Sequence, residues 1–155
     1  AVLLAASLKI GARLGGASVE DADRLYDFGM HIGVAFQLKD DLLDVYGNAK
    51  VFGKNIGGDI LCNKKTYMLI KALEHANADQ HNQLNSWINA ETFQPAEKIA
   101  AVTELYDRIG VKAVCENKIL EYSNRAMESL AAVSIAEEKK EELKKIIENL
   151  IHREV

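Results

Sequence analysis

The sequence predicts an all-α protein, and three observations favour this class. The only proline is Pro95 and the ten glycines gather mainly in the first third, so long stretches contain neither helix breaker. Apolar residues recur at helical spacing, and no segment shows the alternation expected of a strand. The 155 residues are enough for one compact domain with a sizeable core and too few for two.

Two helices are expected in the first third of the chain. Helical spacing of apolar residues over 1–14 ends at Gly15-Gly16, a common helix stop. Ser18 is placed to cap a second helix over 19–46, whose middle is apolar around almost the whole circumference. Residues 47–63 are rich in glycine and have no clear period, so they are predicted to form a loop, and loops of this length are usually functional or disordered.

Capping patterns place two helices after this loop. Asn63 is predicted to cap a helix over 64–76. Asn77 and Gln80 have the spacing of a capping box, which opens a helix that reaches about Ala90.

Three more helices are expected in the last third. Pro95 suits the first turn of a helix that extends to Ile109. The next should cover 111–133. Ser134 and Glu137 then have the spacing of a capping box, which predicts the start of the last helix.

Composition excludes several classes of function. The net charge is −4, from 19 basic and 23 acidic residues, so no general attraction to nucleic acid or anionic lipid follows. The apolar start of the chain is interrupted by Lys9 and Arg13, well short of a membrane-spanning length. Cys62 and Cys115 lack metal-ligand spacing and are typical of free thiols in a reducing cytosol, which favours a cytoplasmic protein.

The helix predicted over 19–46 carries an unusual cluster of carboxylates. Asp40 and Asp44 lie on one face, separated by about 6 Å of rise, and Asp41 is turned away by about 100°. Gln37 lies one turn earlier. Carboxylates this close repel one another unless a cation neutralises them, and oxygen ligands favour a hard ion such as magnesium, completed by water and substrate phosphates. A solvated acidic face is the alternative, but the surrounding residues are apolar, and buried carboxylates need a metal or a partner.

A second element follows in Phe52-Gly53-Lys54-Asn55-Ile56-Gly57-Gly58-Asp59 and in Asn63-Lys64-Lys65-Thr66. Glycines let the backbone approach a ligand closely, and Lys54 and Lys64 supply point charges suited to phosphate. The glycines, the length and the lack of period of the loop over 47–63 indicate a mobile lid that closes over a bound phosphate group through Lys54.

Together, GVAFQLKDDLLDVYG, FGKNIGGDI and NKKT resemble the second aspartate-rich region of trans-type polyprenyl diphosphate synthases, the family of farnesyl and geranylgeranyl diphosphate synthases. The resemblance covers essentially the whole chain. It implies that residues 1–155 are the C-terminal portion of a single all-helical domain, the isoprenoid synthase bundle. The N-terminal half, with the first aspartate-rich motif, is absent from these residues, and the chain opens in the middle of a helical pattern, as a fragment would.

The resemblance also implies an activity. A magnesium-dependent transferase would condense an allylic diphosphate with isopentenyl diphosphate, giving a longer prenyl diphosphate and pyrophosphate. Asp40 and Asp41 would bind magnesium, with Asp44 supporting as a ligand through water. Gln37 would lie beside the diphosphate and the growing carbocation, and Phe36 would border the isopentenyl pocket.

The lysines and the oligomer follow from the same resemblance. Lys54 would hold the allylic diphosphate, Lys64 would add positive charge nearby, and Asp59 would order the loop. The whole enzyme is expected to be a homodimer, and residues 1–155 alone are expected to be inactive. Two alternatives stay open: a class I terpene cyclase, and a non-catalytic partner subunit or helical interaction module.

Overall fold

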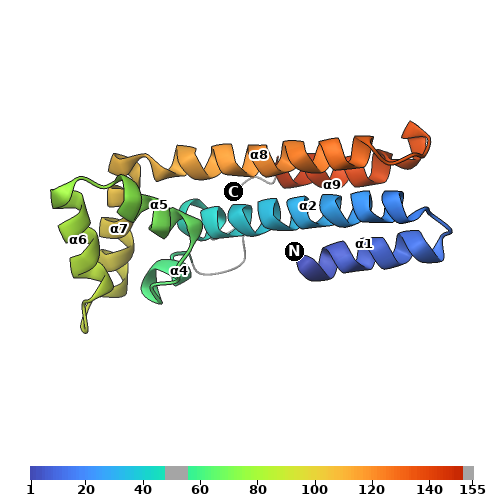
Figure 1. Cartoon of the computed structure of the whole chain (residues 1–155). Helices are drawn as coiled ribbons and strands as arrows, with labels where there is room; N and C mark the ends of the chain where they lie inside the picture. The colour runs from blue at the N-terminus through green and yellow to red at the C-terminus, as the bar shows by residue number, and fades with distance from the viewer. Residues whose placement is uncertain (48–55, 152–155) are drawn as a thin grey trace. The chain divides into compact units, whose positions relative to one another are not determined.

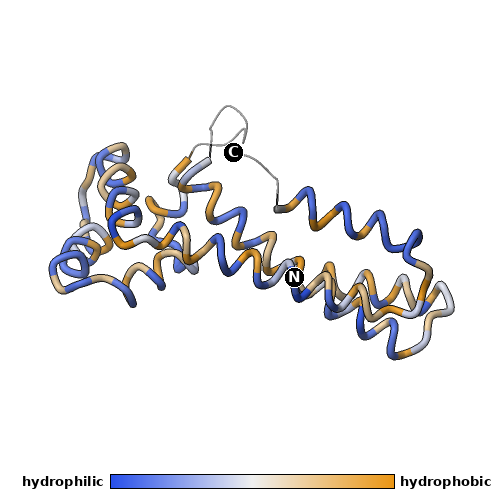
Figure 2. Tube along the Cα trace, turned by 90° about the horizontal axis from the view of Figure 1, so that it is seen from above, coloured by the Kyte–Doolittle hydropathy of each residue, from blue (hydrophilic) through white to orange (hydrophobic). Residues whose placement is uncertain are grey.

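The computed structural model describes residues 1–47 and 56–151. This part of the chain is helical and contains no strand (Figure 1), which confirms the all-α prediction. In chain order the helices are α1 (Val2–Leu14), α2 (Val19–Tyr46), α4 (Gly58–Leu61), α5 (Tyr67–His75), α6 (Ala78–Ile88), α7 (Pro95–Ile109), α8 (Val111–Ala131), the 3-10 turn η1 (Glu137–Lys139) and α9 (Glu141–Ile151). Hydrophobic positions recur among hydrophilic ones along these helices (Figure 2), as amphipathic packing requires.

The chain divides into two compact units. The first comprises Ala1–Lys39 and the described residues from Asn117 onward, and the second comprises Asp40–Glu116. The prediction that residues 1–155 form a portion of one domain stays a prediction.

In the first unit, small residues bring α1 and α2 together. A Cβ atom added to Gly29 would lie 2.6 Å from the Cα of Ala5, and one added to Gly33 would lie 2.5 Å from the Cα of Ala1. Real Cβ atoms do not approach this closely, so glycine is required at both positions for the two helices to meet. Phe28 on α2 is 1% exposed and is the largest fully buried side chain among the described residues.

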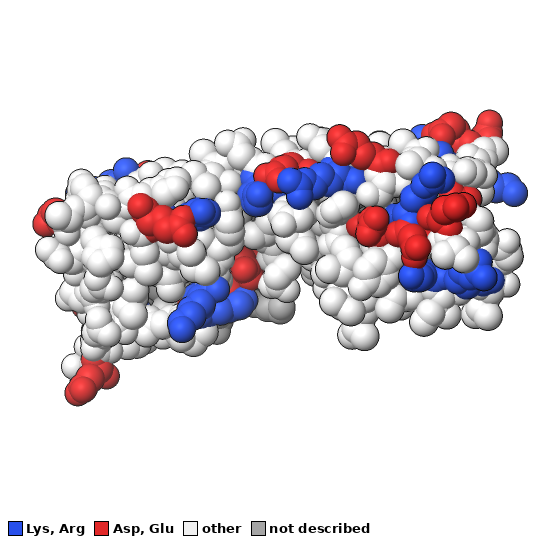
Figure 3. Space-filling view, viewed as in Figure 1, with Lys and Arg blue, Asp and Glu red and all other residues white. Residues whose placement is uncertain are grey.

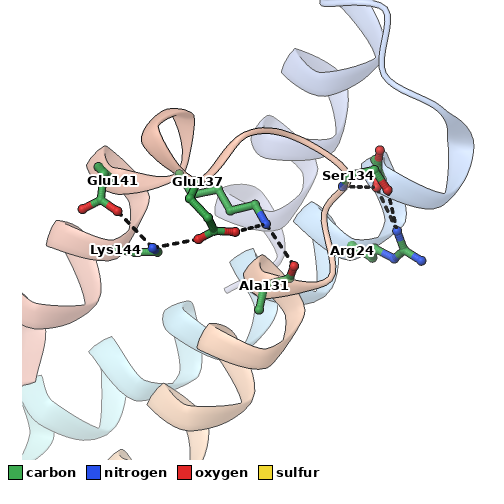
Figure 4. A network of polar contacts seen from close by, with 8 residues as sticks. Arg24, Ala131, Ser134, Glu137, Glu141 and Lys144 are labelled. Carbon is green, nitrogen blue, oxygen red and sulfur yellow. Dashed lines mark hydrogen bonds and ion pairs between the residues drawn. The ribbon is translucent and has the colours of Figure 1, made fainter.

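The expected capping box at Ser134 is wrong. The backbone N–H of Ser134 donates to Asp21 Oδ1 at 2.9 Å, and that carboxylate also accepts from Arg24 at 2.9 Å (Figure 4). Ser134 is thereby tied to α2, 113 residues away in sequence, and Glu137 instead accepts from Lys140 Nζ at 2.8 Å. The last helix begins only at Glu141, after the 3-10 turn.

The second unit is organised around α7, which packs against α4, α5 and α6. Three expectations are confirmed here: Asn77 and Gln80 form a reciprocal capping box on α6, Pro95 occupies the first turn of α7, and Gly110 ends that helix in the left-handed region with φ of 83°. Each pattern satisfies the backbone locally, so no distant partner is needed.

Two expectations between residues 56 and 66 are wrong. Gly58–Leu61 is a helical turn rather than part of a loop. Asn63 does not cap the following helix, because Thr66 does so by accepting from the backbone N–H of Leu69 at 3.2 Å. Asn63 instead adopts a positive φ of 51° and turns its side chain toward other elements.

Surface charge and thiols agree with the composition. Acidic and basic side chains are intermingled on the face shown in Figure 3, in keeping with a net charge of only −4. Cys62 is exposed and Cys115 is buried, and neither takes part in a disulfide. Among the residues described, no helix is long and apolar enough to cross a membrane.

Candidate functional site

The last turns of α2 carry the three predicted carboxylates. Asp41 is 6% exposed, whereas Asp40 and Asp44 are half-buried. The flanking Leu42 and Leu43 are buried, so this stretch of α2 combines core side chains with ionisable ones, as the sequence predicted. Buried carboxylates require compensating partners, and the structure supplies them from residues 57–64.

Lys64 forms ion pairs with two carboxylates, that of Asp41 on α2 and that of Asp59 on α4. Its Nζ lies 2.9 Å from Asp41 Oδ1 and 2.8 Å from Asp59 Oδ2. The hydrogen bonds to Asp59 and to Asp41 raise the pKa of Lys64 well above its usual range. The ammonium therefore stays charged at neutral pH, and it places a cation beside the aspartate-rich end of α2. The sequence predicted a positive charge near the site but did not identify Asp59 as its partner.

Asp44 anchors the segment that follows the glycine-rich stretch. Its Oδ2 accepts from the backbone N–H of Asp59 at 2.9 Å, and its backbone carbonyl accepts from the N–H of Gly57 at 2.7 Å. Burial raises the pKa of Asp44, partly offset by the hydrogen bond from Asp59. In this structure Asp44 thus organises the backbone that presents Asp59.

The donor set fits a metal shared with a ligand better than a site made by protein alone. Within residues 1–47 and 56–151, no three His, Cys, Asp or Glu side chains gather closely enough to enclose an ion. The carboxylates of Asp40 and Asp41 nevertheless supply the hard oxygen donors that magnesium prefers, and this ion commonly completes its shell with water and phosphate oxygens. Asp40 and Asp41 would hold such an ion from the protein side, and the ion would supply positive charge to a bound phosphate group.

The remaining predicted residues fall in different places. Phe36 and Gln37 are exposed on α2, and Phe36 is 49% exposed. Phe36 borders an apolar groove of about 460 Å³. The residues lining the groove are Leu4, Ile32, Phe36, Ile146, Asn149 and Leu150. Lys54 lies outside the described residues, as does the 48–55 part of the loop interpreted as a lid.

One buried charge escaped the sequence analysis. Lys98 on α7 is 1% exposed, and its Nζ donates to Asn63 Oδ1 at 2.8 Å. The signal was present in the sequence, because Lys98 precedes Val102 and Leu105 by four and seven residues and so falls on the apolar stripe of its helix.

Comparison with known proteins assigns the family. Residues 1–106, which include α1, α2 and the aspartate cluster, match the family model described as polyprenyl synthetase. The chain belongs to this family. The resemblance seen in the sequence is thereby confirmed.

Relatives of this chain are isoprenyl diphosphate synthases. A short chain isoprenyl diphosphate synthase of Methanothermobacter thermautotrophicus is 33% identical over 99% of this chain and 46% of its own length. A (2E,6E)-farnesyl diphosphate synthase of Mycobacterium tuberculosis is 29% identical over 99% of this chain and 44% of its own. The chain thus spans about half the length of the curated relatives it matches.

Solved structures of the family share the fold. A crystal structure of a geranylgeranyl pyrophosphate synthase superposes with a TM-score of 0.90 at 33% identity, covering 99% of this chain and 48% of that one. A geranylgeranyl pyrophosphate synthase of Corynebacterium glutamicum, complexed with isoprenyl diphosphate and magnesium, gives 0.81 at 31% identity and covers 92% of this chain and 40% of that one. The all-α architecture is therefore that of the isoprenyl synthases.

Proposed function

We propose that this chain contributes to a magnesium-dependent, head-to-tail prenyltransferase. The reaction condenses an allylic diphosphate with isopentenyl diphosphate and yields a longer prenyl diphosphate and pyrophosphate. One observation carries the proposal: α2 presents Asp40 and Asp41 beside the Lys64 ammonium, which is 2.9 Å from Asp41. Carboxylates for a metal next to a fixed cation are what a diphosphate group requires, and the family membership gives this pair its chemical context.

The residues have distinct roles in this proposal. Asp40 and Asp41 hold the metal from the protein side. Magnesium, when bound, supplies positive charge that stabilises the departing pyrophosphate. Lys64 offers a permanent cation to the diphosphate oxygens, and Asp44 keeps Asp59 in place to hold Lys64. Stabilising charge that develops on the leaving group is the main catalytic effect expected of such a site.

Phe36 and Gln37 on α2 are proposed to contact the substrates. Gln37 is one helical turn before Asp41, which suits an amide that orients the diphosphate or faces the allylic cation. Phe36, half-exposed at the edge of an apolar groove, suits the hydrocarbon part of isopentenyl diphosphate. The family resemblance supports these two assignments.

We further propose where the enzyme is located and how many subunits it has. We place the enzyme in the cytoplasm as a homodimer, supported by two cysteines that are not in a disulfide and by the family resemblance. Sedimentation of the purified protein at its natural length tests the dimer. A monodisperse monomer with full activity would contradict it.

Asp40→Ala tests the proposed activity. In the protein at its natural length, the variant should lose turnover by orders of magnitude, since the metal is then held by a single carboxylate. Release of pyrophosphate from an allylic diphosphate and isopentenyl diphosphate measures it. Asp27→Ala is the matched control, because Asp27 is an exposed aspartate on the same helix. Near-normal turnover of Asp40→Ala would overturn the metal assignment.

A further inference from the structure

Lys98 is buried among neutral partners. Its Nζ donates to Asn63 Oδ1 at 2.8 Å and lies 4.2 Å from the centroid of the Phe93 ring. A lysine that is 1% exposed has lost the hydration of its ammonium group, and these contacts must offset the free-energy cost of that loss. A methionine or leucine would fill such a place at lower cost, which points to a role for the ammonium group itself.

Asn63, which accepts the hydrogen bond from Lys98, lies in the turn between α4 and α5. It adopts a φ of 51°, a left-handed conformation that costs energy in a residue with a side chain. Its side chain makes two bonds: Oδ1 accepts from Lys98, and Nδ2 donates to the backbone carbonyl of Ile88 at 2.9 Å. The turn between α4 and α5 is therefore fixed from α7 on one side and from the end of α6 on the other.

Lys64 follows Asn63 directly. Its backbone N–H donates to the carbonyl of Asp59 at 2.9 Å, and its own carbonyl accepts from the N–H of Thr66 at 2.7 Å. The direction in which the Lys64 side chain leaves this turn depends on the conformation of Asn63, because rotation about one residue redirects the next. From this turn the Nζ of Lys64 reaches both Asp41 and Asp59.

Direct binding of substrate by Lys98 does not fit the geometry. Lys98 and Lys64 both line a cavity of about 20 Å³, which has room for about one water molecule. A diphosphate could not enter it. Any effect of Lys98 on the site must therefore be exerted through the protein.

We propose that Lys98 is a positioning residue which, through Asn63, holds Lys64 between Asp41 and Asp59 in readiness for a diphosphate. The diphosphate part of this inference rests on the proposed function, whereas the positioning of Lys64 does not. In this proposal, Lys98 on the core face of α7 determines where the ammonium group of Lys64 lies.

The ammonium signals of the lysines in a nitrogen-15 NMR spectrum test the positioning. An ammonium group gives a sharp signal when hydrogen bonds slow its proton exchange, so Lys64 should be visible in the unaltered protein. Lys140 is the internal control: it is 2% exposed, and its Nζ donates to Ala131 O at 2.9 Å and to Glu137 Oε1 at 2.8 Å. Lys98→Met should remove the Lys64 signal and leave that of Lys140.

Two variants of Asn63 keep the test decisive if Lys98→Met does not fold. Asn63→Gly permits the positive φ but deletes the hydrogen bonds to both Lys98 and Ile88, so it should also remove the Lys64 signal. Asn63→Asp retains an oxygen that accepts from Lys98 and should restore the signal. If Asn63→Gly folds, as judged from the backbone amide signals of α5 and α7 in the second unit, and retains an unchanged Lys64 signal, the proposal is wrong.

Binding of inorganic pyrophosphate with magnesium separates the two hypotheses. In the protein at its natural length, Asn63→Gly should weaken pyrophosphate binding about tenfold, as expected when one charge-assisted hydrogen bond is misplaced. Asn63→Asp should bind nearly as the unaltered protein does. If the Lys64 signal disappears while affinity is unchanged, the positioning role stands and the diphosphate role of Lys64 in the proposed function fails.

Discussion

The two compact units each bury a lysine, but α1 of the first unit leaves large apolar side chains exposed. The second unit encloses the ammonium of Lys98, which is 1% exposed. In the first unit, α1 leaves Leu3 and Leu14 each 85% exposed. Lys140 of the first unit is also buried, at 2% exposed, so the contrast lies in the apolar side chains of α1, which the described residues leave uncovered.

This difference separates an organised site from an open surface. In the second unit, Lys98 of α7 donates to Asn63, and the backbone N–H of Asp59 donates to Asp44. Lys64, which follows Asn63, forms an ion pair with Asp41. In the first unit, the exposed leucines of α1 form part of an apolar surface of the kind that marks interaction sites. The expectation that residues 1–155 alone are inactive and associate with other chains stays a prediction, to be tested by sedimentation.

The largest effect is expected from the core of the first unit. Phe28→Ala removes a ring that is 1% exposed and should lower the free energy of unfolding by about 3–5 kcal/mol. Leu3→Ala, in the same unit, should change it by less than about 0.5 kcal/mol, because its side chain is already in water. Urea denaturation of both variants measures the contrast. A large loss in Leu3→Ala would show that α1 is covered in solution.

A pair of glycines tests how tightly the second unit is built. Gly57 and Gly110 have nearly equal positive φ angles, 85° and 83°. A Cβ at Gly57 would lie 2.6 Å from the Ile99 side chain, whereas one at Gly110 meets nothing within 4 Å. Gly110→Ala should therefore cost about 1–2 kcal/mol from the backbone alone, and Gly57→Ala about 1–3 kcal/mol more from overpacking. Equal losses in thermal or urea unfolding would contradict the close packing of this turn.

The smallest effect is a pH dependence in the first unit. Hydrogen bonds from Lys140 and Lys144 lower the pKa of Glu137 from 4.5 to about 2. Because the folded pKa is depressed, this contribution to stability is present above pH 4.5 and is lost as the pH falls toward about 2.

Glu137→Gln should flatten the stability curve in this range, and Glu138→Gln, at the neighbouring exposed position, serves as its control. Stability measured by urea unfolding between pH 5 and the acid limit of the fold reports the difference. Identical curves for Glu137→Gln and the unaltered protein would show that the network in Figure 4 does not form in solution.

What could be predicted from the sequence depended on where each polar group found its partner. The Asn77 and Gln80 capping box was predictable because both partners lie within one turn. Ser134 with Glu137 has an equally good pattern, yet Asp21 captures the Ser134 N–H from 113 residues away. Local spacing cannot reveal such a competitor.

The candidate site shows the same limit. The carboxylates of α2 were predictable from spacing alone, since a helix fixes their separation. The roles of Asp44 and Asp59 were not, because they depend on a backbone N–H and an ammonium brought together by the turn at Asn63. Lys98 could have been singled out as a charge on an apolar stripe, but its partner could not.

The central claim is that Asp40 and Asp41 bind a divalent metal only together with a diphosphate. Manganese, a paramagnetic substitute for magnesium, broadens NMR signals of nearby nuclei, so the backbone signals of residues 37–44 report its position. We expect these signals to broaden when manganese and inorganic pyrophosphate are added together, and to change little with either alone. Equal broadening by manganese alone, or none with both present, would contradict the account.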